Sequence, residues 1–573
     1  MRDTVHNLVA EAAIAHPDRV AVVAGTTTLT YRELGLRADR LAGSLAALGV
    51  SPGTAVGVFL PRSADFVVAV LAILKAGGQY VPLDPEYPAT RLALMLDAVR
   101  ALVVVTNGDL APVLLPQTGS VLRVDQPLAG RLAPPVEVHP DDLAYTMFTS
   151  GSTGVPKEVA VRHRGVVRLV RDPGVVRLDD TDVVLHLSSP SFDAATFDIW
   201  GALANGARLV VAPPGRPSVV EIGALLREQA VTTAFFPTGL FHLMVDERLD
   251  DLAGIRQVVV GGDVLSARHS HRLVRTLPDC RLINGYGPTE VTTFTTFHQV
   301  RADQSETVPV PIGRPLACTR VLVLDAELAP VPIGEVGQLF AGGDGLARGY
   351  LDPALTAERF VPDPWLSGER LYATGDLARC TQNGVFEYVG RADRQVKKRG
   401  FRVEPDEVEV ALRGDPDVRD AVVVTDGDTA DNRRLIAYLV ADSAAGVRAR
   451  LRSVLPDYLV PDVWVLLDSL PLNENGKVDR RALPVPEPGT TGSDNAELSI
   501  EESAITEIWQ EILELARVGR HDDFFDLGGH SLLANRIVAR VRRRLGVDVP
   551  LSAVFDHPTV AELAVVVRGA GRQ

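Results

Sequence analysis

Short runs rich in valine and leucine alternate with amphipathic segments through roughly the first 390 residues of this chain. The segment Tyr31–Leu48 has helical apolar spacing, and Thr30 followed by Glu33 forms a capping box at its start. The apolar runs predict buried strands at 56–60, 102–106, 183–187, 208–212 and 257–260. Strands that alternate with helices indicate parallel sheets covered by helices, so we expect an α/β fold here.

A smaller unit follows, from about residue 394 to residue 483. It has a helical pattern at 408–412 and strand patterns at 421–425, 435–440 and 463–467, which together indicate an α+β unit. Proline and glycine then cluster in 483–493, a composition typical of a linker. A helical pattern resumes at 499–513, and Thr559 with Glu562 forms another capping box. A chain of 573 residues is too long for one hydrophobic core, which is consistent with a division into several structural units.

Charge and cysteine usage limit the partners and the compartment. The net charge of −15 argues against non-specific nucleic-acid binding. Cys280, Cys318 and Cys380 form no CxxC pair and have no zinc-ligand spacing, so a reducing compartment fits best. The most apolar stretch, Phe66–Leu74, is far shorter than a membrane span, and the N-terminus lacks a signal-peptide core. We therefore expect a cytoplasmic protein with no nucleic-acid or membrane partner.

A hydroxyl- and glycine-rich loop follows a strand pattern at 143–149. It runs from Thr149 to Lys157; its small residues would let backbone N–H groups approach phosphate oxygens, and Lys157 adds positive charge. The order Gly-Lys-Ser/Thr of a Walker A loop is missing. Taken alone, this loop is as readily a flexible connection as a nucleotide site.

A second motif centres on Ser531, in the run Asp-Asp-Phe-Phe-Asp-Leu-Gly-Gly-His-Ser-Leu at 522–532. Apolar residues at helical spacing follow, so we expect Ser531 at or near a helix N-cap, beside flexible glycines. A Gly-Gly-X-Ser pattern by itself is usually only a cap. The full run resembles the phosphopantetheine attachment site of peptidyl carrier proteins, whose serine carries an arm ending in a thiol that holds an acyl group as a thioester.

Further motifs occur in a fixed order: Asn-Gly-Tyr-Gly-Pro-Thr-Glu at 284–290, Tyr-Ala-Thr-Gly-Asp-Leu at 372–377, Gly-Arg-Ala-Asp-Arg-Gln-Val-Lys at 390–397 and Asn-Gly-Lys-Val-Asp-Arg at 475–480. With the phosphate loop and the segments 29–34, 74–84, 337–351 and 455–461, this set resembles the adenylation domains of nonribosomal peptide synthetases, members of the adenylate-forming superfamily. No single motif decides the resemblance; their order does.

The resemblance implies four parts. They are a large α/β adenylation subdomain at 1–392, a small mobile α+β subdomain at 393–483, a linker at 484–498 and an all-α four-helix carrier domain at 499–573. It also implies ATP, Mg²⁺ and 4′-phosphopantetheine as cofactors, and a phosphopantetheinyl transferase as a partner.

The implied reaction is the attack of a carboxylate on the α-phosphate of ATP, which gives an acyl-adenylate and pyrophosphate. Lys477 would bridge the carboxylate and the phosphate. Glu290 would bind Mg²⁺, which prefers few carboxylates plus phosphate oxygens, and Thr289 would donate to the α-phosphate. The implied ATP-binding residues are Thr149, Ser150, Gly151, Ser152, Thr153, Gly154, Lys157, Tyr286, Asp376, Tyr388 and Arg391.

A second step is implied as well. In the family the small subdomain rotates about a hinge, here Asp393, and presents another face to the incoming thiol. Lys397 and Gly400 would line that face.

The segment Phe192–Phe197 matches the substrate pocket of amino-acid-activating members, in which Asp193 would pair with the α-ammonium group. The part of the pocket expected to hold the substrate side chain has no charged residue, so charged and amide side chains would be buried without a partner and rejected. We expect a small branched side chain, with L-valine first, isoleucine second and leakage to 2-aminobutyrate. The other implied pocket residues are Ala194, Phe197, Phe235, Val259, Gly261, Gly285, Thr293 and Phe294, together with Lys477.

Two alternatives stay open. Glu158 stands directly after Pro-Lys, where the family usually has glycine, and its carboxylate could repel phosphate or pair with Lys157. We favour a solvent-facing Glu158, but an inactive adenylation domain that acts mainly as a carrier would also explain it. The other alternative is a ligase for a non-amino carboxylic acid, against which Asp193 argues.

No condensation domain precedes these motifs and no thioesterase follows them. The sequence therefore predicts a stand-alone or loading unit that hands its product in trans to a downstream synthetase or tailoring enzyme. The resemblance also allows an MbtH-like protein as a partner.

Overall fold

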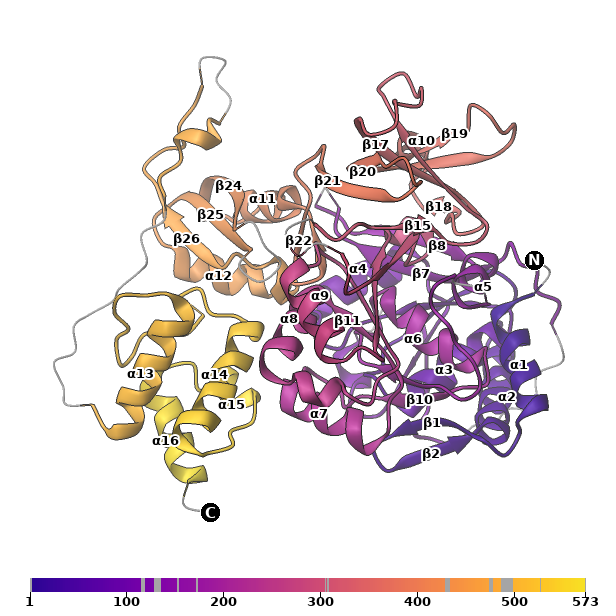
Figure 1. The fold of residues 1–573 in the computed structure, drawn as a ribbon, viewed down its shortest axis with the longest axis horizontal. Helices are drawn as coiled ribbons and strands as arrows, with labels where there is room; N and C mark the ends of the chain where they lie inside the picture. The colour runs from indigo at the N-terminus through magenta and orange to yellow at the C-terminus, as the bar shows by residue number, and fades with distance from the viewer. Residues whose placement is uncertain are drawn as a thin grey trace.

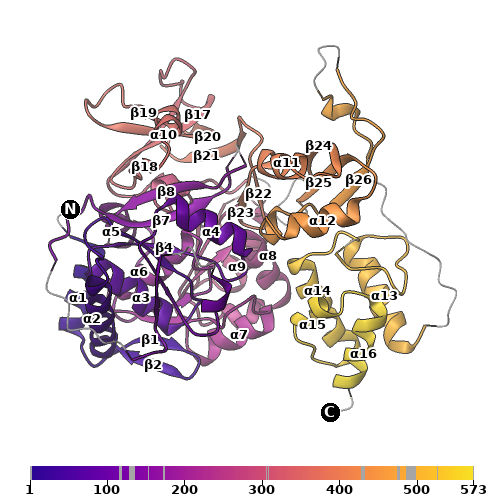
Figure 2. The same ribbon diagram turned by 180° about the vertical axis from the view of Figure 1, so that it is seen from behind.

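The structure is a computed structural model. It describes residues 3–571 except 115–118, 128–135, 152–153, 172–173, 305, 307–308, 428–432, 474–477, 486–497 and 526, and gives only the backbone of Ser531 and Leu532. A large N-terminal body, a smaller subdomain at 396–466 and a helical unit at 500–570 follow one another along the chain (Figure 1). Seen from behind, the helical unit lies next to both other parts (Figure 2).

Two mostly parallel sheets form the centre of the large body. The nine-stranded sheet has the order β15-β14-β13-β12-β11-β9-β10-β1-β2 and the seven-stranded sheet the order β18-β8-β7-β4-β3-β5-β6. The first contains β1 (Val20–Ala24), β2 (Thr27–Thr30), β9 (Val183–His186), β10 (Arg208–Val211), β11 (Thr233–Pro237), β12 (Gln257–Gly261), β13 (Arg281–Tyr286), β14 (Thr296–Val300) and β15 (Arg314–Pro315). The second contains β3 (Ala55–Val58), β4 (Gln79–Pro82), β5 (Val103–Thr106), β6 (Ser120–Arg123), β7 (Leu143–Thr149), β8 (Lys157–Arg162) and β18 (Gly349–Tyr350).

Helices cover these sheets, as the sequence predicted. One core joins residues of α1, α2, α3, α5 and α6 with the strands, and a second joins α7, α8 and α9 to the nine-stranded sheet. The predicted capping box of Thr30 and Glu33 is present. The helices are α1 (Val5–Ala15), α2 (Tyr31–Ala47), α3 (Ala64–Lys75), α4 (Ala89–Ala98), α5 (His163–Arg171), α6 (Ala194–Leu203), α7 (Val219–Glu228), α8 (Thr238–Glu247), α9 (Ala267–Thr276) and α10 (Pro353–Arg359), with 3-10 turns η1 (Ala111–Val113), η2 (Leu249–Leu252) and η3 (Thr289–Val291).

A third, antiparallel sheet was not predicted. Its strands follow one another with few helices between them, so the strand–helix alternation that revealed the other sheets gives no signal here. It contains β16 (Thr319–Leu324), β17 (Val336–Gly343), β19 (Phe360–Pro362), β20 (Arg370–Cys380) and β21 (Phe386–Arg391).

The small subdomain has the predicted α+β character. The hairpin of β22 (Val396–Lys398) and β23 (Phe401–Val403) leads into α11 (Pro405–Arg413) and a three-stranded sheet. That sheet contains β24 (Val418–Asp426), β25 (Arg434–Ala441) and β26 (Val463–Leu466); α12 (Ala444–Arg452) and the turns η4 (Asp457–Leu459) and η5 (Arg480–Ala482) complete the unit.

The C-terminal unit is a four-helix domain with its own core. Its helices are α13 (Ile500–Leu513), α14 (Ser531–Leu545), α15 (Ser552–Asp556) and α16 (Val560–Ala570), and the predicted capping box of Thr559 and Glu562 opens α16. Trp509 is fully buried with its ring 5.2 Å from that of Phe524. None of the helices in the described part of the chain combines the length and apolar character needed to cross a bilayer.

Because this core is separate, Trp509→Ala should unfold the helical unit alone. Removing a buried tryptophan costs about 3–5 kcal/mol. Calorimetry should show a lower transition temperature for one unit and an unchanged transition for the large body. Val565→Ala, at an exposed site on α16, is the control and should leave both transitions in place. A single transition that shifts as a whole would show that the two cores unfold together.

Candidate functional site

The phosphate-type loop is bound by carboxylates of the small subdomain. The Gly151 N–H donates to Glu407 Oε2 at 2.9 Å, and Lys157 Nζ lies 3.4 Å from Glu404 Oε1. Glu407 also accepts from Arg91 at 3.0 Å. Burial raises the pKa of Glu407, an effect that Arg91 and the Gly151 N–H oppose. The loop therefore holds anionic oxygens with donors of the kind that bind phosphate.

Two hydroxyls complete the described part of this loop. Ser150 Oγ donates to the Arg402 carbonyl at 2.8 Å. Thr149 Oγ1 is buried and has no hydrogen-bond partner among the described residues. The predicted donors Ser152 and Thr153 lie outside the described residues.

Glu158 does not reach the phosphate side of this loop. On β8 it alternates with Lys157, so the two side chains point to opposite faces. Burial raises the pKa of the Glu158 carboxyl, and Asp352 raises it further. Lys157 is paired with Glu404 instead. We expected Glu158 to face solvent; the structure places it on the face opposite Lys157, but leaves it partly buried. Gly154, at φ +84°, packs against Val410 of α11.

Glu290 forms a buried ion pair across the boundary between the large body and the small subdomain. Arg402 Nη1 donates to both carboxylate oxygens, at 2.9 and 2.8 Å, and the Tyr350 hydroxyl donates at 2.6 Å. Burial opposes ionisation of Glu290, but Arg402 and Tyr350 together hold its pKa below the ordinary value. The guanidinium of Arg402 is thus the positively charged partner of the Glu290 carboxylate.

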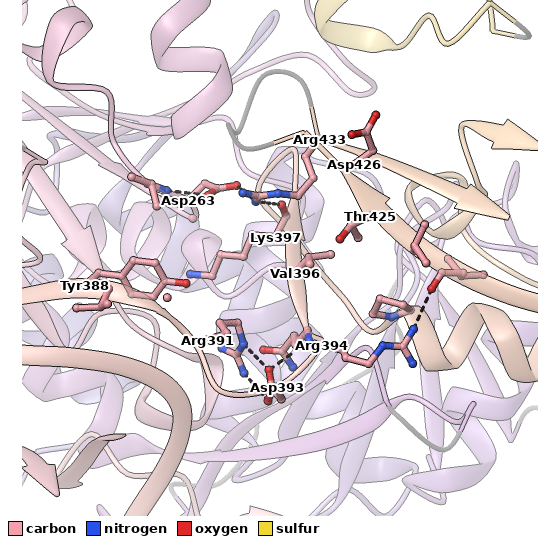
Figure 3. A pocket seen from close by; sticks show the side chains of 18 of the residues that line it. Asp263, Tyr388, Arg391, Asp393, Arg394, Val396, Lys397, Thr425, Asp426 and Arg433 are labelled. Atoms are coloured by element: carbon pink, nitrogen blue, oxygen red, sulfur yellow. Dashed lines mark hydrogen bonds and ion pairs between the residues drawn. The ribbon is translucent and has the colours of Figure 1, made fainter. Parts of the chain in front are cut away.

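A cavity of about 890 Å³ lies between the large body and the small subdomain. Tyr388, Arg391 and Lys397 are among the side chains that line it (Figure 3). Asp376, which lines the neighbouring cavity, accepts from the Tyr286 hydroxyl at 2.5 Å and from Arg391 Nη1 at 2.7 Å. These four predicted ATP-binding residues, Tyr286, Asp376, Tyr388 and Arg391, therefore lie together.

The predicted pocket residues gather around a second cavity, of about 190 Å³. Its floor is made by neighbouring strands, because Gly261 of β12 pairs with Gly285 of β13. A Cβ on Gly285 would lie 2.7 Å from the Phe294 ring, so only glycine fits there. The predicted residues that line the cavity are Asp193, Ala194, Phe235, Gly261, Gly285, Thr293 and Phe294, and Thr289 lines it too.

Two further predicted pocket residues support this wall from behind. The ring of Phe197 lies 5.6 Å from that of Phe294, in an edge-on arrangement. Val259 is fully buried beside Phe235 in the next strand. Apart from Asp193, Thr289 and Thr293, the residues named for this wall are apolar or glycine.

Asp193 is partly buried, and no cation contacts its carboxyl among the described residues. Burial raises the pKa of this carboxyl above the ordinary value; the Thr289 hydroxyl opposes the shift and Glu290 adds to it, while Lys397 opposes it from a distance. No ion pair joins Asp193 in the part of the chain that the structure covers. A ligand ammonium group would supply a positive charge in direct contact.

The hairpin β22–β23 packs into the large body beside both cavities. Its turn contains Arg399 at φ +56° and Gly400 at φ +85°, and a Cβ on Gly400 would lie 3.2 Å from Pro237. The Phe401 ring meets Phe192 edge-on at 4.6 Å. Gly400 and Lys397 therefore face the large body.

The predicted hinge residue Asp393 lies between β21 and β22. Its carboxylate accepts from Arg391 Nε and Nη2 at 2.7 and 2.9 Å. The predicted catalytic Lys477 lies outside the described residues.

Ser531 is the first residue of α14, and His530 is its N-cap. Gly528 before it has φ +88°, and the Gly529 N–H donates to the carbonyl of buried Phe524 at 2.8 Å. The serine thus stands at a helix start next to a turn anchored in the core, as expected from the sequence.

Sequence reasoning missed several residues of this site. Arg402, Glu404 and Glu407 all contact predicted site residues, but on the chain they resemble the charged start of an ordinary helix. Their partners are more than 100 residues away, so no local spacing could have revealed them.

The residues present fit a magnesium nucleotide. Among the described residues there is no cluster of three or more metal-binding side chains. Mg²⁺ does not require such a cluster, because it is usually held by one or two carboxylates together with phosphate oxygens. Glu290 offers the carboxylate, and the unpartnered Thr149 hydroxyl and Lys157 offer donors to phosphate.

Family models match three parts of the chain. Residues 9–351 match "AMP-binding enzyme", residues 407–477 match "AMP-binding enzyme C-terminal domain" and residues 503–566 match "Phosphopantetheine attachment site".

Similar proteins are large synthases. The chain is 46% identical to a subunit of linear gramicidin synthase and 40% identical to tyrocidine synthase 3, both from Brevibacillus parabrevis. These matches cover 97% and 98% of this chain but only 7% and 9% of the synthases.

Two solved structures are similar to this chain, one of them over its whole length. Holo-PA1221, an NRPS protein containing adenylation and PCP domains bound to a vinylsulfonamide inhibitor, matches 100% of this chain and 97% of its own at 32% identity, with a TM-score of 0.88. NpsA-ThdA, an artificially fused adenylation-PCP di-domain from Klebsiella oxytoca, matches 82% of this chain and 95% of its own at 32% identity, with a TM-score of 0.77.

The Glu290–Arg402 pair should hold the small subdomain in the arrangement described. Arg402→Ala leaves Glu290 buried and unpaired, and breaking such a pair costs about 3–5 kcal/mol. Hydrogen exchange should therefore show lost protection of the hairpin at 396–403. Arg419→Ala, which breaks an exposed pair with Asp442, is the control and should change nothing. Unchanged protection of the hairpin in Arg402→Ala would contradict this role.

Proposed function

Because the chain belongs to the AMP-binding enzyme family and carries a phosphopantetheine attachment domain, we propose that it activates an amino acid with ATP and loads it as a thioester on Ser531. One observation carries this proposal. A single cavity is lined by the phosphate-type loop, by Asp193 and by the hairpin turn at Gly400. Groups suited to a phosphate, an ammonium group and an incoming arm therefore meet at one point.

ATP and Mg²⁺ are the cofactors of this family, and 4′-phosphopantetheine is the cofactor of the carrier domain. When bound, Mg²⁺ neutralises phosphate charge and the arm supplies a thiol nucleophile. In the proposed scheme Glu290 holds the metal, Asp376 accepts the ribose hydroxyls and Tyr286 and Tyr388 pack on the nucleoside. Thr149, Lys157 and Arg391 donate to phosphate and ribose, with Ser150, Gly151, Ser152, Thr153 and Gly154 forming the rest of the loop.

Adenylate formation needs the phosphate donors free. In the structure described, the Gly151 N–H and Lys157 are taken by Glu407 and Glu404. The small subdomain must move away before ATP binds there, and in that state we assign Lys477 to bridge the substrate carboxylate and the α-phosphate. Thr289 donates to the same phosphate.

The arrangement described suits the second step. The turn at Gly400 and the side chain of Lys397 face both cavities, and Asp393 stands at the junction about which the subdomain would rotate. A phosphopantetheinyl transferase must first modify Ser531, because the thiol that attacks the adenylate belongs to the arm. Downstream acceptor enzymes and an MbtH-like partner remain part of the proposal.

The substrate we propose is L-valine, with isoleucine second. Asp193 takes the α-ammonium group, and its burial without an ion pair favours a positively charged ligand group. Phe235, Phe294 and the small residues Ala194, Gly261 and Gly285 leave a short apolar space. A non-amino acid would leave Asp193 unpaired, and the position of Glu158 on the opposite face from Lys157 gives no support to an inactive site.

The substrate assignment predicts valine-dependent exchange of labelled pyrophosphate into ATP. One methylene changes discrimination by about 10–200-fold, so isoleucine and 2-aminobutyrate should be weaker by amounts in that range. Asp193→Asn should weaken exchange for every amino acid, because the charged partner of the ammonium is lost. The absence of exchange with any branched amino acid would defeat the valine assignment, and full turnover in Asp193→Asn would favour a non-amino acid.

The role of Lys477 predicts that Lys477→Ala slows pyrophosphate exchange by roughly 10²–10³-fold, the usual effect of losing one donor to developing charge. Mass spectrometry should still detect pantetheinylation of Ser531 in this variant, because the carrier has its own core, but the valyl adduct should form correspondingly more slowly. Lys75→Ala, at a lysine paired with Asp39, is the matched control and should exchange normally. Exchange at the original rate in Lys477→Ala would remove this residue from the mechanism.

A further inference from the structure

Arg168 is a buried cation with carbonyl partners in place of a carboxylate. It lies on α5, and only 2% of it is exposed. Nη2 donates to the carbonyls of Val291, Thr292 and Phe294 at 2.9, 3.0 and 2.9 Å, and Nη1 donates to Thr319 Oγ1 at 2.9 Å. No ion pair of Arg168 occurs within the described residues. Burial lowers its pKa to about 10, so it stays protonated at neutral pH.

The carbonyls that accept hydrogen bonds from Arg168 belong to a backbone turn with an unusual conformation. Thr292 and Thr293 have φ of +54° and +65°, the left-handed region, which β-branched residues strongly avoid. Three carbonyl dipoles that converge on one point repel each other unless a donor sits between them. The guanidinium supplies that donor.

Two glycines make room for this arrangement. A Cβ on Gly345 would lie 2.6 Å from the Arg168 guanidinium carbon, and a Cβ on Gly165 would lie 2.5 Å from Thr292 Oγ1. Thr292 Oγ1 in turn donates to the Gly345 carbonyl at 2.7 Å. The turn is therefore fixed from both sides.

The fixed turn presents the wall of the substrate pocket. Thr293 Oγ1 donates to the Asp193 carbonyl at 2.8 Å, which joins the turn to the segment that carries the ammonium partner. Phe294 fills the space between Phe197, Phe235 and Phe297. A displacement of the turn would move Thr293 and Phe294 together and would change the size of the cavity.

We propose that Arg168 is a positioning residue that sets amino-acid specificity by holding the 291–294 turn in its left-handed conformation. Arg168 touches no substrate atom in this proposal; it acts through Thr293 and Phe294. The inference rests on the proposed function, because it names what fixes the shape of the proposed amino-acid pocket.

The test is the exchange assay on the full chain with Arg168→Gln and Arg168→Lys. Glutamine cannot reach all three carbonyls, so the KM for valine should rise about tenfold or more, and the preference for valine over isoleucine should fall about fivefold or more. The KM for ATP should stay within about twofold of the wild-type value, because Thr293 and Phe294 do not line the larger cavity proposed for the nucleotide. Arg168→Lys keeps the positive charge but loses the planar, forked set of guanidinium donors. Its KM for valine and its preference for valine over isoleucine should therefore lie between those of the wild type and of Arg168→Gln.

Arg208→Gln is the matched control. Arg208 also donates to a carbonyl, that of Gln229 at 2.7 Å, but at the opposite end of the strands from the pocket. It should leave the valine preference unchanged. An unchanged valine KM and preference in Arg168→Gln, or an equal change in Arg208→Gln, would overturn the inference.

If Arg168→Gln does not fold, Thr319→Val replaces it, since this change removes one acceptor of the guanidinium without emptying the site. A smaller shift of the valine preference in the same direction supports the inference, and no shift overturns it. The proposed function fails separately, if the wild-type chain gives no exchange with any amino acid.

Discussion

The arrangement of this molecule depends on matched charges across the boundary between the large body and the small subdomain. Glu290 of the body forms an ion pair with Arg402 of the subdomain. Lys157 of the body pairs with Glu404, and the Gly151 N–H donates to Glu407. Each pair is buried or nearly so, and an unpaired charge there would be costly. Phosphate oxygens need the same donors as these carboxylates. If this loop binds the nucleotide phosphates as we propose, those phosphates and the docked subdomain would compete for the same donors, which would give the proposed alternation between two states a direct physical cause.

The site lies where open α/β sheets usually place one. β11, β12 and β13 are parallel, and their carboxyl ends carry Pro237, Gly261 and the segment from Gly285 to Glu290. Polar groups after neighbouring parallel strands meet at one edge, and ligands bind there. The two cavities and the hairpin turn at Gly400 all gather at this edge. In the proposed scheme the sheet supplies the substrate pocket, and the small subdomain supplies the groups that move in and out.

Much of this could be predicted from the sequence, for reasons that differ between residues. The capping boxes at Thr30 and Thr559 are local patterns, and both are present. The strands at 183–187 and 257–260 are continuous apolar runs, and they form where expected. The antiparallel sheet of β16, β17, β19, β20 and β21 was missed, because few helices separate its strands, and such helices are what reveal parallel pairing. Arg402 and Arg168 were missed because their partners lie more than 100 residues away, and nothing beside them on the chain marks an arginine as buried.

Specificity and alternation place opposite demands on neighbouring residues. In the proposed scheme Glu290 exchanges Arg402 for the metal ion when the small subdomain moves, whereas Thr293 and Phe294 keep the same positions in both states. They are only three and four residues further along the chain. Arg168 and the flanking glycines anchor the turn after Glu290 to α5 and to the segment at Gly345, both in the large body. These anchors would keep the backbone just after Glu290 in place whatever its carboxylate binds, so that in the proposed scheme the pocket keeps one shape while the charge partner of Glu290 changes.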